Sequence, residues 1–389
     1  MIKSDEIGVI GAGAMGVGIA QVIATAGTKV VLHDSNNAAL EVAQNKLEAI
    51  LNRLVEKEKL DANSAKEILD RIEFSKGIEA FKDCGLIIEA IVENLEIKKA
   101  VFTEVESLVD KDCVLASNTS SLSIASIASA CKIPSRVIGI HFFNPAPLLP
   151  LVEIISAVQT DPNLSSQIKS LVEEWGKVPV IAKDTPGFIV NRIARPFYGE
   201  AIRMLEEGIA NVPTIDWAMK EFGGFKMGPF ELMDFIGNDI NYEVTSTVFK
   251  EFFYDPRYKP SFTQKRMVEA NRLGRKTGIG YYNYNDEAAN LEPERNDALG
   301  QYLMDRILIM LINEAADALY LHIATRDDID MAMTKGVNYP KGLLTWADER
   351  GIDVCLNALE ELQSEYGEDR YRPSPIFKKM LRKGEQFYP

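Results

Sequence analysis

A histidine and a glutamate lie close together in a chain that uses little histidine. The segment "HFFNPAPLLPLVEII" begins with His141, one of only three histidines in 389 residues, and its last apolar run contains Glu153. Histidine is the usual proton acceptor near neutral pH, and a carboxylate on its other ring nitrogen would fix the tautomer. A carboxylate among leucines and isoleucines is costly unless it is paired. The pattern predicts a His141–Glu153 pair that removes a proton. The alternative is a satisfied core histidine and an edge-strand acid.

A glycine-rich turn near the N-terminus predicts a dinucleotide cofactor. An apolar strand over residues 7–10 runs into Gly11-x-Gly13-x-x-Gly16 and then a helix. Such glycines allow a tight turn and a close approach of backbone to a pyrophosphate, and the helix N-terminus attracts phosphates. The next strand, "KVVLHD", ends in Asp34, which can accept hydrogen bonds from ribose hydroxyls and would repel a 2′-phosphate. The sequence therefore predicts NAD rather than NADP; a turn that binds nothing is the alternative.

Polar residues follow three further predicted strands. "CGLIIEAIVEN" ends in Glu89 and Glu93, "CVLAS" runs into the polar stretch 117–121, and "RVIGIH" ends in His141. Ligands of open α/β sheets bind at the carboxyl ends of the strands. One or two of the hydroxyls in 117–121 could only cap the following helix, but five small polar residues exceed what a cap needs. We therefore expect a cofactor, a hydroxyl cluster and a histidine at one crevice.

Two helices broken near residues 60–63 are predicted between the second and third strands. Lys46, Arg53 and Lys57 recur at helical spacing and share one face. Interspersed glutamates make a solvated face one interpretation. A docking face for a polyphosphate ligand is the other.

Composition restricts the class of protein. The formal net charge of −14 argues against nucleic acid or an anionic membrane as a partner. The four cysteines are scattered, with neither metal nor disulfide spacing, so we expect reduced thiols and no metal. No window is long and apolar enough for a membrane span, and the chain starts directly with a strand, which leaves no room for a signal peptide. A cytoplasmic location is expected.

The C-terminal half contains an internal repeat at an offset of 114 residues. Glu200-Ala201 corresponds to Glu314-Ala315, Asp216 to Asp330, and Asn191 to Asp305. Asn191 itself lies in a predicted helix that is entered through Thr185-Pro-Gly and should kink near Pro196. The second copy loses the asparagine, so we interpret it as structural, covering copy one as in a dimer. This predicts a monomer. The predicted parts are a cofactor domain (1–184), helical copy one (185–284), a linker (285–295) and helical copy two (296–389).

Seven motifs carry a resemblance to one family. They are "GAGAMGVGIAQ", "IIEAIVENLEIKK", "ASNTSSL", "HFFNPAPLLPLVEII", "KDTPGFIVNRI", "MGPFELMDFIG" and "GRKTGIGYYNY". In this order, over residues 5–284, they resemble the L-3-hydroxyacyl-CoA dehydrogenases, including 3-hydroxybutyryl-CoA dehydrogenases. The resemblance implies an α/β Rossmann-type NAD-binding domain; the repeat adds two tandem all-α domains.

The resemblance also implies roles. His141 would be the base and Glu153 its orienting partner. Ser120 and Asn191 would bind the substrate hydroxyl or thioester carbonyl, Asn144 would brace the site near the nicotinamide, and Lys57 would contact coenzyme A. The cofactor site would comprise Gly11, Gly13, Gly16, Asp34, Glu93, Lys98 and Lys276. Ile50 stands where a polar coenzyme A contact is expected, and Leu149-Pro150 replaces the family's Met-Lys.

The predicted function is NAD-dependent oxidation of L-3-hydroxyacyl-CoA to 3-ketoacyl-CoA, or the reverse reduction. One alternative is a dehydrogenase of a free hydroxy acid or sugar acid such as L-gulonate, because related sugar-acid enzymes share the "HFFNP" region. Another is a non-catalytic NAD-binding structural protein, as related lens crystallins suggest.

Overall fold

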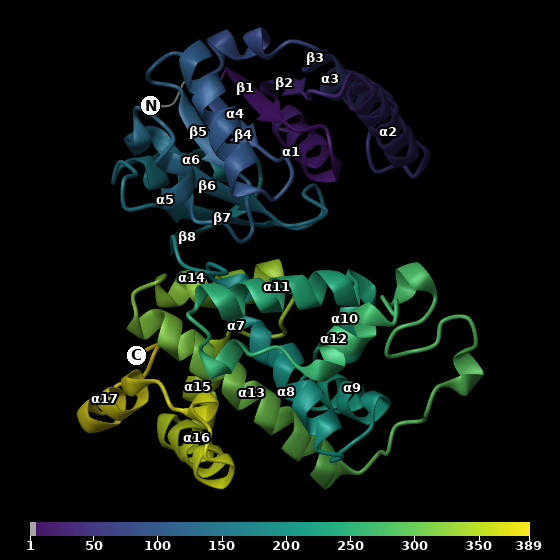
Figure 1. Ribbon diagram of the computed structural model, residues 1–389, viewed down its shortest axis with the longest axis vertical. Coiled ribbons are helices and arrows are strands. Elements are labelled where there is room, and N and C mark those ends of the chain that lie inside the picture. Colours follow the sequence, from purple (N-terminus) through teal and green to yellow (C-terminus); the bar gives the residue numbers. More distant parts are fainter. Residues whose placement is uncertain (1–4) are drawn as a thin grey trace. The chain divides into compact units, whose positions relative to one another are not determined.

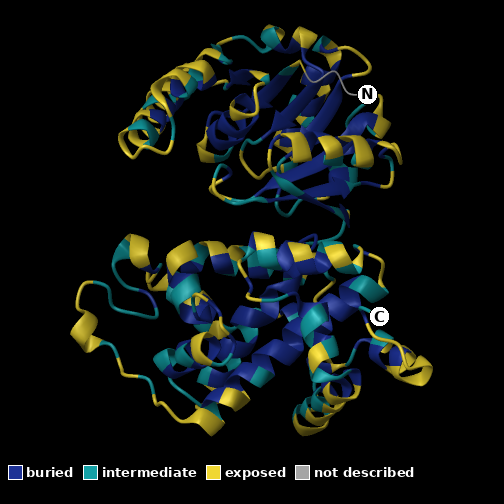
Figure 2. Ribbon diagram, turned by 180° about the vertical axis from the view of Figure 1, so that it is seen from behind, coloured by how far each residue is buried: buried dark blue, intermediate teal, exposed yellow. Residues whose placement is uncertain are grey.

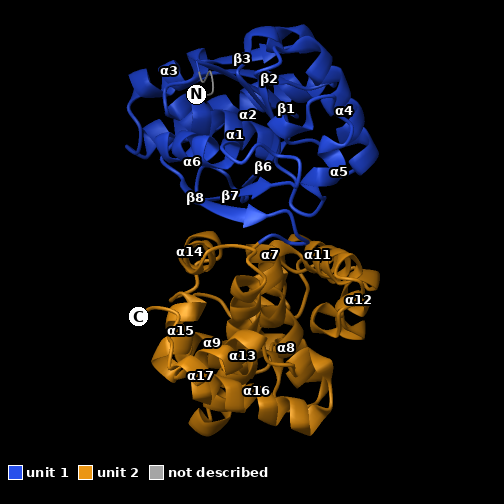
Figure 3. Ribbon diagram, turned by 90° about the vertical axis from the view of Figure 1, so that its left-hand side faces the viewer, with its two compact units in different colours: residues 1–188 blue, residues 189–389 orange. Residues whose placement is uncertain are grey.

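Short runs rich in valine and isoleucine form an eight-stranded sheet in this computed structural model, which describes residues 5–389. The chain divides into two compact units between Phe188 and Ile189 (Figure 3). The sheet of the first unit has the order β3-β2-β1-β4-β5-β6-β7-β8. Strands β1 to β6 are parallel, in the order that dinucleotide-binding domains use. The strands are β1 (Glu6–Ile10), β2 (Lys29–His33), β3 (Ile72–Ser75), β4 (Leu86–Glu89), β5 (Val114–Ser117), β6 (Val137–Phe142), β7 (Leu151–Ser156) and β8 (Val178–Lys183).

The last two strands break the parallel pattern. β7 runs antiparallel to β6, and β8 runs parallel to β7. In the β6–β7 register His141 lies directly opposite Glu153. Residues that face each other across a strand pair project to the same side of a sheet. The two side chains proposed to work together are therefore brought together by backbone pairing alone.

Helices flank this sheet, and side-chain caps define where several of them begin (Figure 1). Asn36, Asp61, Asn94 and Ser123 each accept a hydrogen bond from a backbone N–H of the first turn. The helical hairpin predicted between the second and third strands is present, with its break at residues 57–61. The helices are α1 (Ala14–Thr25), α2 (Asn37–Glu56), α3 (Ala62–Asp70), α4 (Leu95–Leu108), α5 (Ile124–Ala128) and α6 (Leu164–Glu174).

The second unit is helical throughout. Its longest helix, α13, is buried on nearly all sides, and α8, α9, α15 and α17 pack against it (Figure 2). The helices are α7 (Val190–Ile193), α8 (Arg195–Glu206), α9 (Val212–Glu221), α10 (Pro229–Ile236), α11 (Asn238–Glu251), α12 (Phe262–Glu269), α13 (Asp297–Tyr320), α14 (Arg326–Gly336), α15 (Leu343–Arg350), α16 (Ile352–Tyr366) and α17 (Pro375–Lys383).

One sequence prediction in this unit needs correction. The helix expected to kink near Pro196 is instead two helices, α7 and α8, which meet at Ala194. Proline lacks the N–H that would continue the helix, but it is well suited to the first turn of a new one. Pro196 occupies that place in α8.

Two buried ion-pair networks link the two halves of the second unit, residues 189–284 and residues 296–389. Arg306 binds Glu200 (2.9 Å), and Arg192 lies 3.5 Å from Glu314. Both arginines and both glutamates are 114 positions apart in the sequence. Tyr371 donates to Glu200 (2.7 Å) just as Tyr258 donates to Glu314 (2.6 Å). Each buried glutamate is therefore bound by an arginine and a tyrosine from the other half of the unit.

Within residues 5–389, no helix combines the length and the apolar character needed to cross a membrane.

Candidate active site

The His141–Glu153 pair forms as predicted from the sequence. His141 Nδ1 lies 2.7 Å from Glu153 Oε2, and both residues are buried. A carboxylate accepts only, so Nδ1 carries the proton and donates it to Glu153. Nε2, the other ring nitrogen, is thereby directed away from the carboxylate.

Two aromatic rings hold the imidazole. The ring centroid of Phe143 lies 4.5 Å and that of Phe188 5.9 Å from that of His141. Phe188 is itself fully buried and has a φ of +48°, a conformation uncommon for bulky residues. With the Glu153 hydrogen bond, these contacts restrict rotation of the His141 ring.

The polar turn after β5 is organised by one carboxylate. Glu93 Oε1 accepts hydrogen bonds from the Thr119 and Ser121 hydroxyls and from the backbone N–H of Ser120 and Ser121. Partial burial would raise the pKa of Glu93, but the Lys98 charge and these hydrogen bonds outweigh it and lower the pKa. Glu93 is therefore ionised, and it positions the backbone of Ser120. No hydrogen bond occupies the Ser120 hydroxyl within the described part of the chain.

A buried ion pair lies beneath this turn. Lys98 binds Glu89 (2.6 Å) and Glu93 (3.3 Å), and Ser117 donates to Glu89 (2.7 Å). The family resemblance implied that Lys98 and Glu93 belong to the cofactor site. In the structure Lys98 is buried and its charge is matched by two carboxylates, so it supports the polar turn after β5.

The glycine turn after β1 has the shape that a pyrophosphate requires. A Cβ on Gly16 would lie 1.7 Å from the Gly11 carbonyl oxygen, and Gly11 has a φ of +103°. A Cβ on Gly13 would meet no atom within 4 Å, so the turn is open there. Asp34 closes it by accepting hydrogen bonds from Ala12 N (2.8 Å) and Asn36 N (2.9 Å). These residues fit the phosphates and ribose of NAD.

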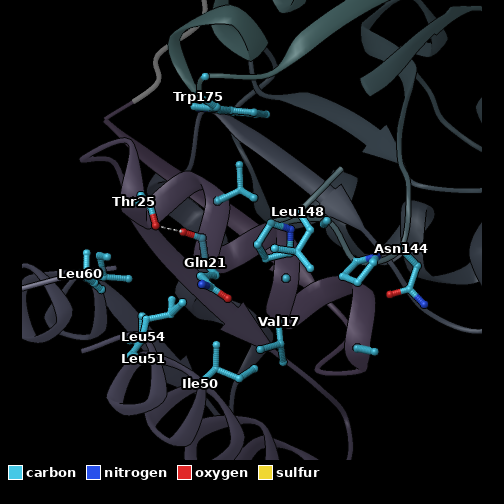
Figure 4. A pocket seen from close by; sticks show the side chains of 18 of the residues that line it. Val17, Gln21, Thr25, Ile50, Leu51, Leu54, Leu60, Asn144, Leu148 and Trp175 are labelled. Carbon is cyan, nitrogen blue, oxygen red and sulfur yellow. Dashed lines mark hydrogen bonds between the residues drawn. The ribbon is translucent and has the colours of Figure 1, made fainter. Parts of the chain in front are cut away.

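A groove of about 660 Å³ opens beside the cofactor turn. It lies between helices α1 and α2 and the loop that follows β6; Figure 4 shows Asn144 and Leu148 on one side and Ile50, Leu54 and Leu60 on another. Three lysines line it, Lys46, Lys59 and Lys177, and no aspartate or glutamate does. In a chain with a net charge of −14 this is a local basic site.

Lys177 was missed by sequence reasoning. Its ammonium group donates to the carbonyl oxygens of Ala146 (2.6 Å) and Leu149 (3.0 Å), and burial lowers its pKa. It thereby holds the loop that carries Asn144 against the groove. The only signal was a lysine just before a strand, at "GKVPV", which has no distinctive spacing.

The remaining predicted residues lie on other elements of the chain. Asn144 is exposed on the loop after β6, before a cis proline, and Lys57 ends α2 outside the set of residues that line the groove. Asn191 on α7 and Lys276 on a 3₁₀ turn belong to the second unit, where Lys276 binds Asp239 (2.5 Å).

Comparisons with known proteins agree on one family. The model of the "3-hydroxyacyl-CoA dehydrogenase, NAD binding domain" matches residues 6–185, and that of the "3-hydroxyacyl-CoA dehydrogenase, C-terminal domain" matches residues 187–284 and 302–386. The chain is 36% identical over 97% of its length to 3-hydroxyadipyl-CoA dehydrogenase of Escherichia coli strain K12, 98% of which is covered. It is 42% identical over 72% of its length to the whole of a probable 3-hydroxybutyryl-CoA dehydrogenase of Deinococcus radiodurans. A crystal structure of 3-hydroxybutyryl-CoA dehydrogenase from E. coli K12 superposes with a TM-score of 0.94, at 36% identity, over 98% of this chain and 99% of that one.

The placement of Asp34 generates a prediction about cofactor choice. Replacing Asp34 with Ser should reduce the ratio of kcat/KM for NAD to that for NADP at least about 10-fold, because the carboxylate no longer binds the ribose or repels a 2′-phosphate. Steady-state kinetics with both cofactors measure this. An unchanged ratio would mean that another group reads the ribose.

Proposed function

The chain belongs to the 3-hydroxyacyl-CoA dehydrogenase family as an NAD-dependent enzyme, and we propose that its reaction depends on the His141–Glu153 pair. The observation that carries this proposal is the 2.7 Å contact between a buried imidazole and a buried carboxylate, near the carboxyl end of β6, on the sheet edge where the cofactor turn after β1 also lies. Bound NAD would supply the acceptor for the hydride of substrate C3. The residues of the chain must remove the proton of the C3 hydroxyl.

His141 can take that proton directly. Nε2 is the free base because Glu153 engages Nδ1, and the Glu153 carboxylate stabilises the imidazolium that forms. The Ser120 hydroxyl is assigned to donate to the substrate oxygen, and the backbone N–H of Ser120 is held by Glu93. Asn191, which belongs to the second unit, is also assigned to donate to the substrate oxygen. Asn144 is assigned to brace the site near the nicotinamide. In the reverse direction, the imidazolium returns the proton to the reduced oxygen.

The groove beside α1 and α2 is proposed to bind coenzyme A. Its apolar walls suit a pantetheine arm, and Lys46 and Lys59 suit phosphates. A free hydroxy acid would not need such a groove, which favours a thioester substrate. The relatives' names share the 3-hydroxyacyl thioester and differ in the acyl end: an adipyl group carries a terminal carboxylate, whereas a butyryl group ends in a methyl.

We further propose that the two halves of the second unit are copies of one helical domain. Three observations support this. The ion-pair networks exchange partners between equivalent positions, which is the pattern of a two-fold interface. Asp216 and Asp330 each accept two backbone hydrogen bonds from residues 14 and 15 positions later. The Deinococcus relative, covered completely, aligns with only 72% of this chain. The second copy then takes the place of a partner subunit.

Replacement of His141 with Gln tests the catalytic proposal. Loss of the base should lower kcat about 10²–10⁴-fold with acetoacetyl-CoA and NADH, while NAD binding, followed by calorimetry, persists. The matched control is His322→Asn on the second unit; Asn tolerates the φ of +55° found there, and activity should be retained. A His141→Gln enzyme of near-normal rate would refute the base assignment.

Charge removal tests the coenzyme A groove. The double variant Lys46→Gln/Lys59→Gln should raise KM for acetoacetyl-CoA roughly 10-fold, given up to about 1 kcal/mol for each exposed charge contact, and leave KM for NADH unchanged. The comparison variant is Lys57→Gln, at the position that the family resemblance assigns to coenzyme A. If only Lys57→Gln raises KM, the phosphates bind outside the groove.

Sedimentation tests the internal duplication. If copy two occupies the surface that would otherwise bind a partner, the protein should sediment with the mass of one chain at micromolar concentration. A stable homodimer held together through the second unit would contradict this arrangement.

A further inference from the structure

Arg195, on α8 of the second unit, is a buried arginine without a counter-ion. It is 7% exposed. Its Nε donates to the Asn191 carbonyl oxygen (2.9 Å), its Nη1 donates to the Thr245 hydroxyl (3.2 Å), and its guanidinium lies 5.0 Å from the ring centroid of Tyr198. No carboxylate within residues 5–389 lies within ion-pair distance of it. The four other buried arginines of those residues, Arg136, Arg192, Arg306 and Arg370, all have one.

A buried tyrosine lies within electrostatic range of Arg195. The Tyr339 hydroxyl is buried and has no hydrogen-bond partner. Burial raises the pKa of Tyr339 well above its usual value, Tyr198 raises it further, and the charge of Arg195 opposes both. Tyr339 is therefore a protonated donor within electrostatic range of Arg195. A buried donor without an acceptor costs free energy, and this one lies within electrostatic range of a cation that has no counter-ion.

The second half of the unit provides an internal comparison. At the positions that correspond to Arg195, Tyr198 and Thr245, it has the buried residues Ile309, Ile312 and Leu359, and Phe225 stands where the other half has Tyr339. The same helices therefore pack with an entirely apolar set. Replacing buried charges by well-packed apolar residues is often neutral or stabilising. Because an apolar set can fill these positions, packing alone does not account for Arg195 and Tyr339, which points to a ligand.

We propose that Arg195 and Tyr339 bind a carboxylate at the far end of the acyl chain, which makes the substrates 3-hydroxyacyl-CoA esters of dicarboxylic acids. The inference rests on the proposed function, in which Asn191 binds the C3 hydroxyl. Arg195 follows Asn191 by four residues across the junction of α7 and α8, a separation of roughly 6 Å for helical backbone, and its Nε donates back to the Asn191 carbonyl oxygen. A carboxylate a few carbons beyond C3 spans such a distance, and guanidinium is the side-chain group best suited to bind it.

The test compares two thioesters of equal chain length. Initial rates with NAD are measured for 3-hydroxyadipyl-CoA and 3-hydroxyhexanoyl-CoA, which differ only in the terminal carboxylate. The wild-type protein should have the higher kcat/KM for the adipyl ester. Arg195→Ile, which introduces the residue of the other copy, should lower the adipyl-to-hexanoyl ratio about 10²-fold or more. Tyr339→Phe, which introduces the residue found at position 225, should lower it about 10-fold.

A matched control and the opposing outcomes complete the experiment. Arg203→Gln removes a charge from the same helix, where Arg203 pairs with the half-exposed Glu368, and should leave the ratio unchanged. Equal loss with both esters in Arg195→Ile would mean that Arg195 only positions Asn191, and would overturn the proposal, as would a wild-type enzyme without preference. If Arg195→Ile fails to melt cooperatively, Tyr339→Phe decides by the same ratio. A wild-type protein inactive on both esters and on acetoacetyl-CoA would instead refute the proposed function.

Discussion

Burial of the Glu153 carboxylate is the constraint on which the active site depends. A charge in the middle of a sheet is tolerated only with partners, and the antiparallel pairing of β6 with β7 places His141 directly opposite. This pairing also ends the parallel part of the sheet, because β7 runs opposite to β6. Strands β1 to β5 bring the cofactor turn and the Glu93-held turn to one edge, and β6 delivers the imidazole to that edge. The His141–Glu153 pair and the glycine turn after β1 are thus two consequences of one sheet.

The second unit also buries carboxylates, and there the partners are arginines. Its buried glutamates are neutralised across the two halves, by Arg306 on one side and Arg192 on the other. Because removing one partner of a buried pair leaves an uncompensated charge, these networks make each half depend on the other. Away from the networks the halves diverge: one retains a polar set around Arg195, and the other packs isoleucine and leucine at the corresponding positions.

The net charge of the chain is negative, whereas the groove beside α1 and α2 is lined by positive charges. The overall charge of −14 opposes polyanions in general. The charged residues that line the groove beside α1 and α2 are nevertheless all lysines. One of them, Lys177, is partly withdrawn from solvent and holds the loop after β6. Selective binding of an anionic thioester by an acidic protein requires this kind of local segregation, because exposed charges farther apart than about 10 Å are largely screened by salt.

Much of the first unit could be predicted from the sequence because its signals are local. Consecutive apolar residues indicated the strands, the spacing of Gly11, Gly13 and Gly16 predicted the cofactor turn, and a carboxylate in an apolar run predicted a pairing with His141. The prediction of one kinked helix at Pro196 was less accurate than these. A proline permits either a kink or the start of a new helix, and packing selects between them.

The sequence by itself determined which chemical groups are present and which strands and helices carry them. Only the tertiary structure decided how each group is satisfied. It placed Lys59 and Lys177 on the groove and Lys57 outside the residues that line it, matched Lys98 with two carboxylates, and left Arg195 with none. The physical reason is that burial and counter-charge depend on residues distant in the chain. Helical spacing predicts that side chains share a face, but it does not predict what packs against that face.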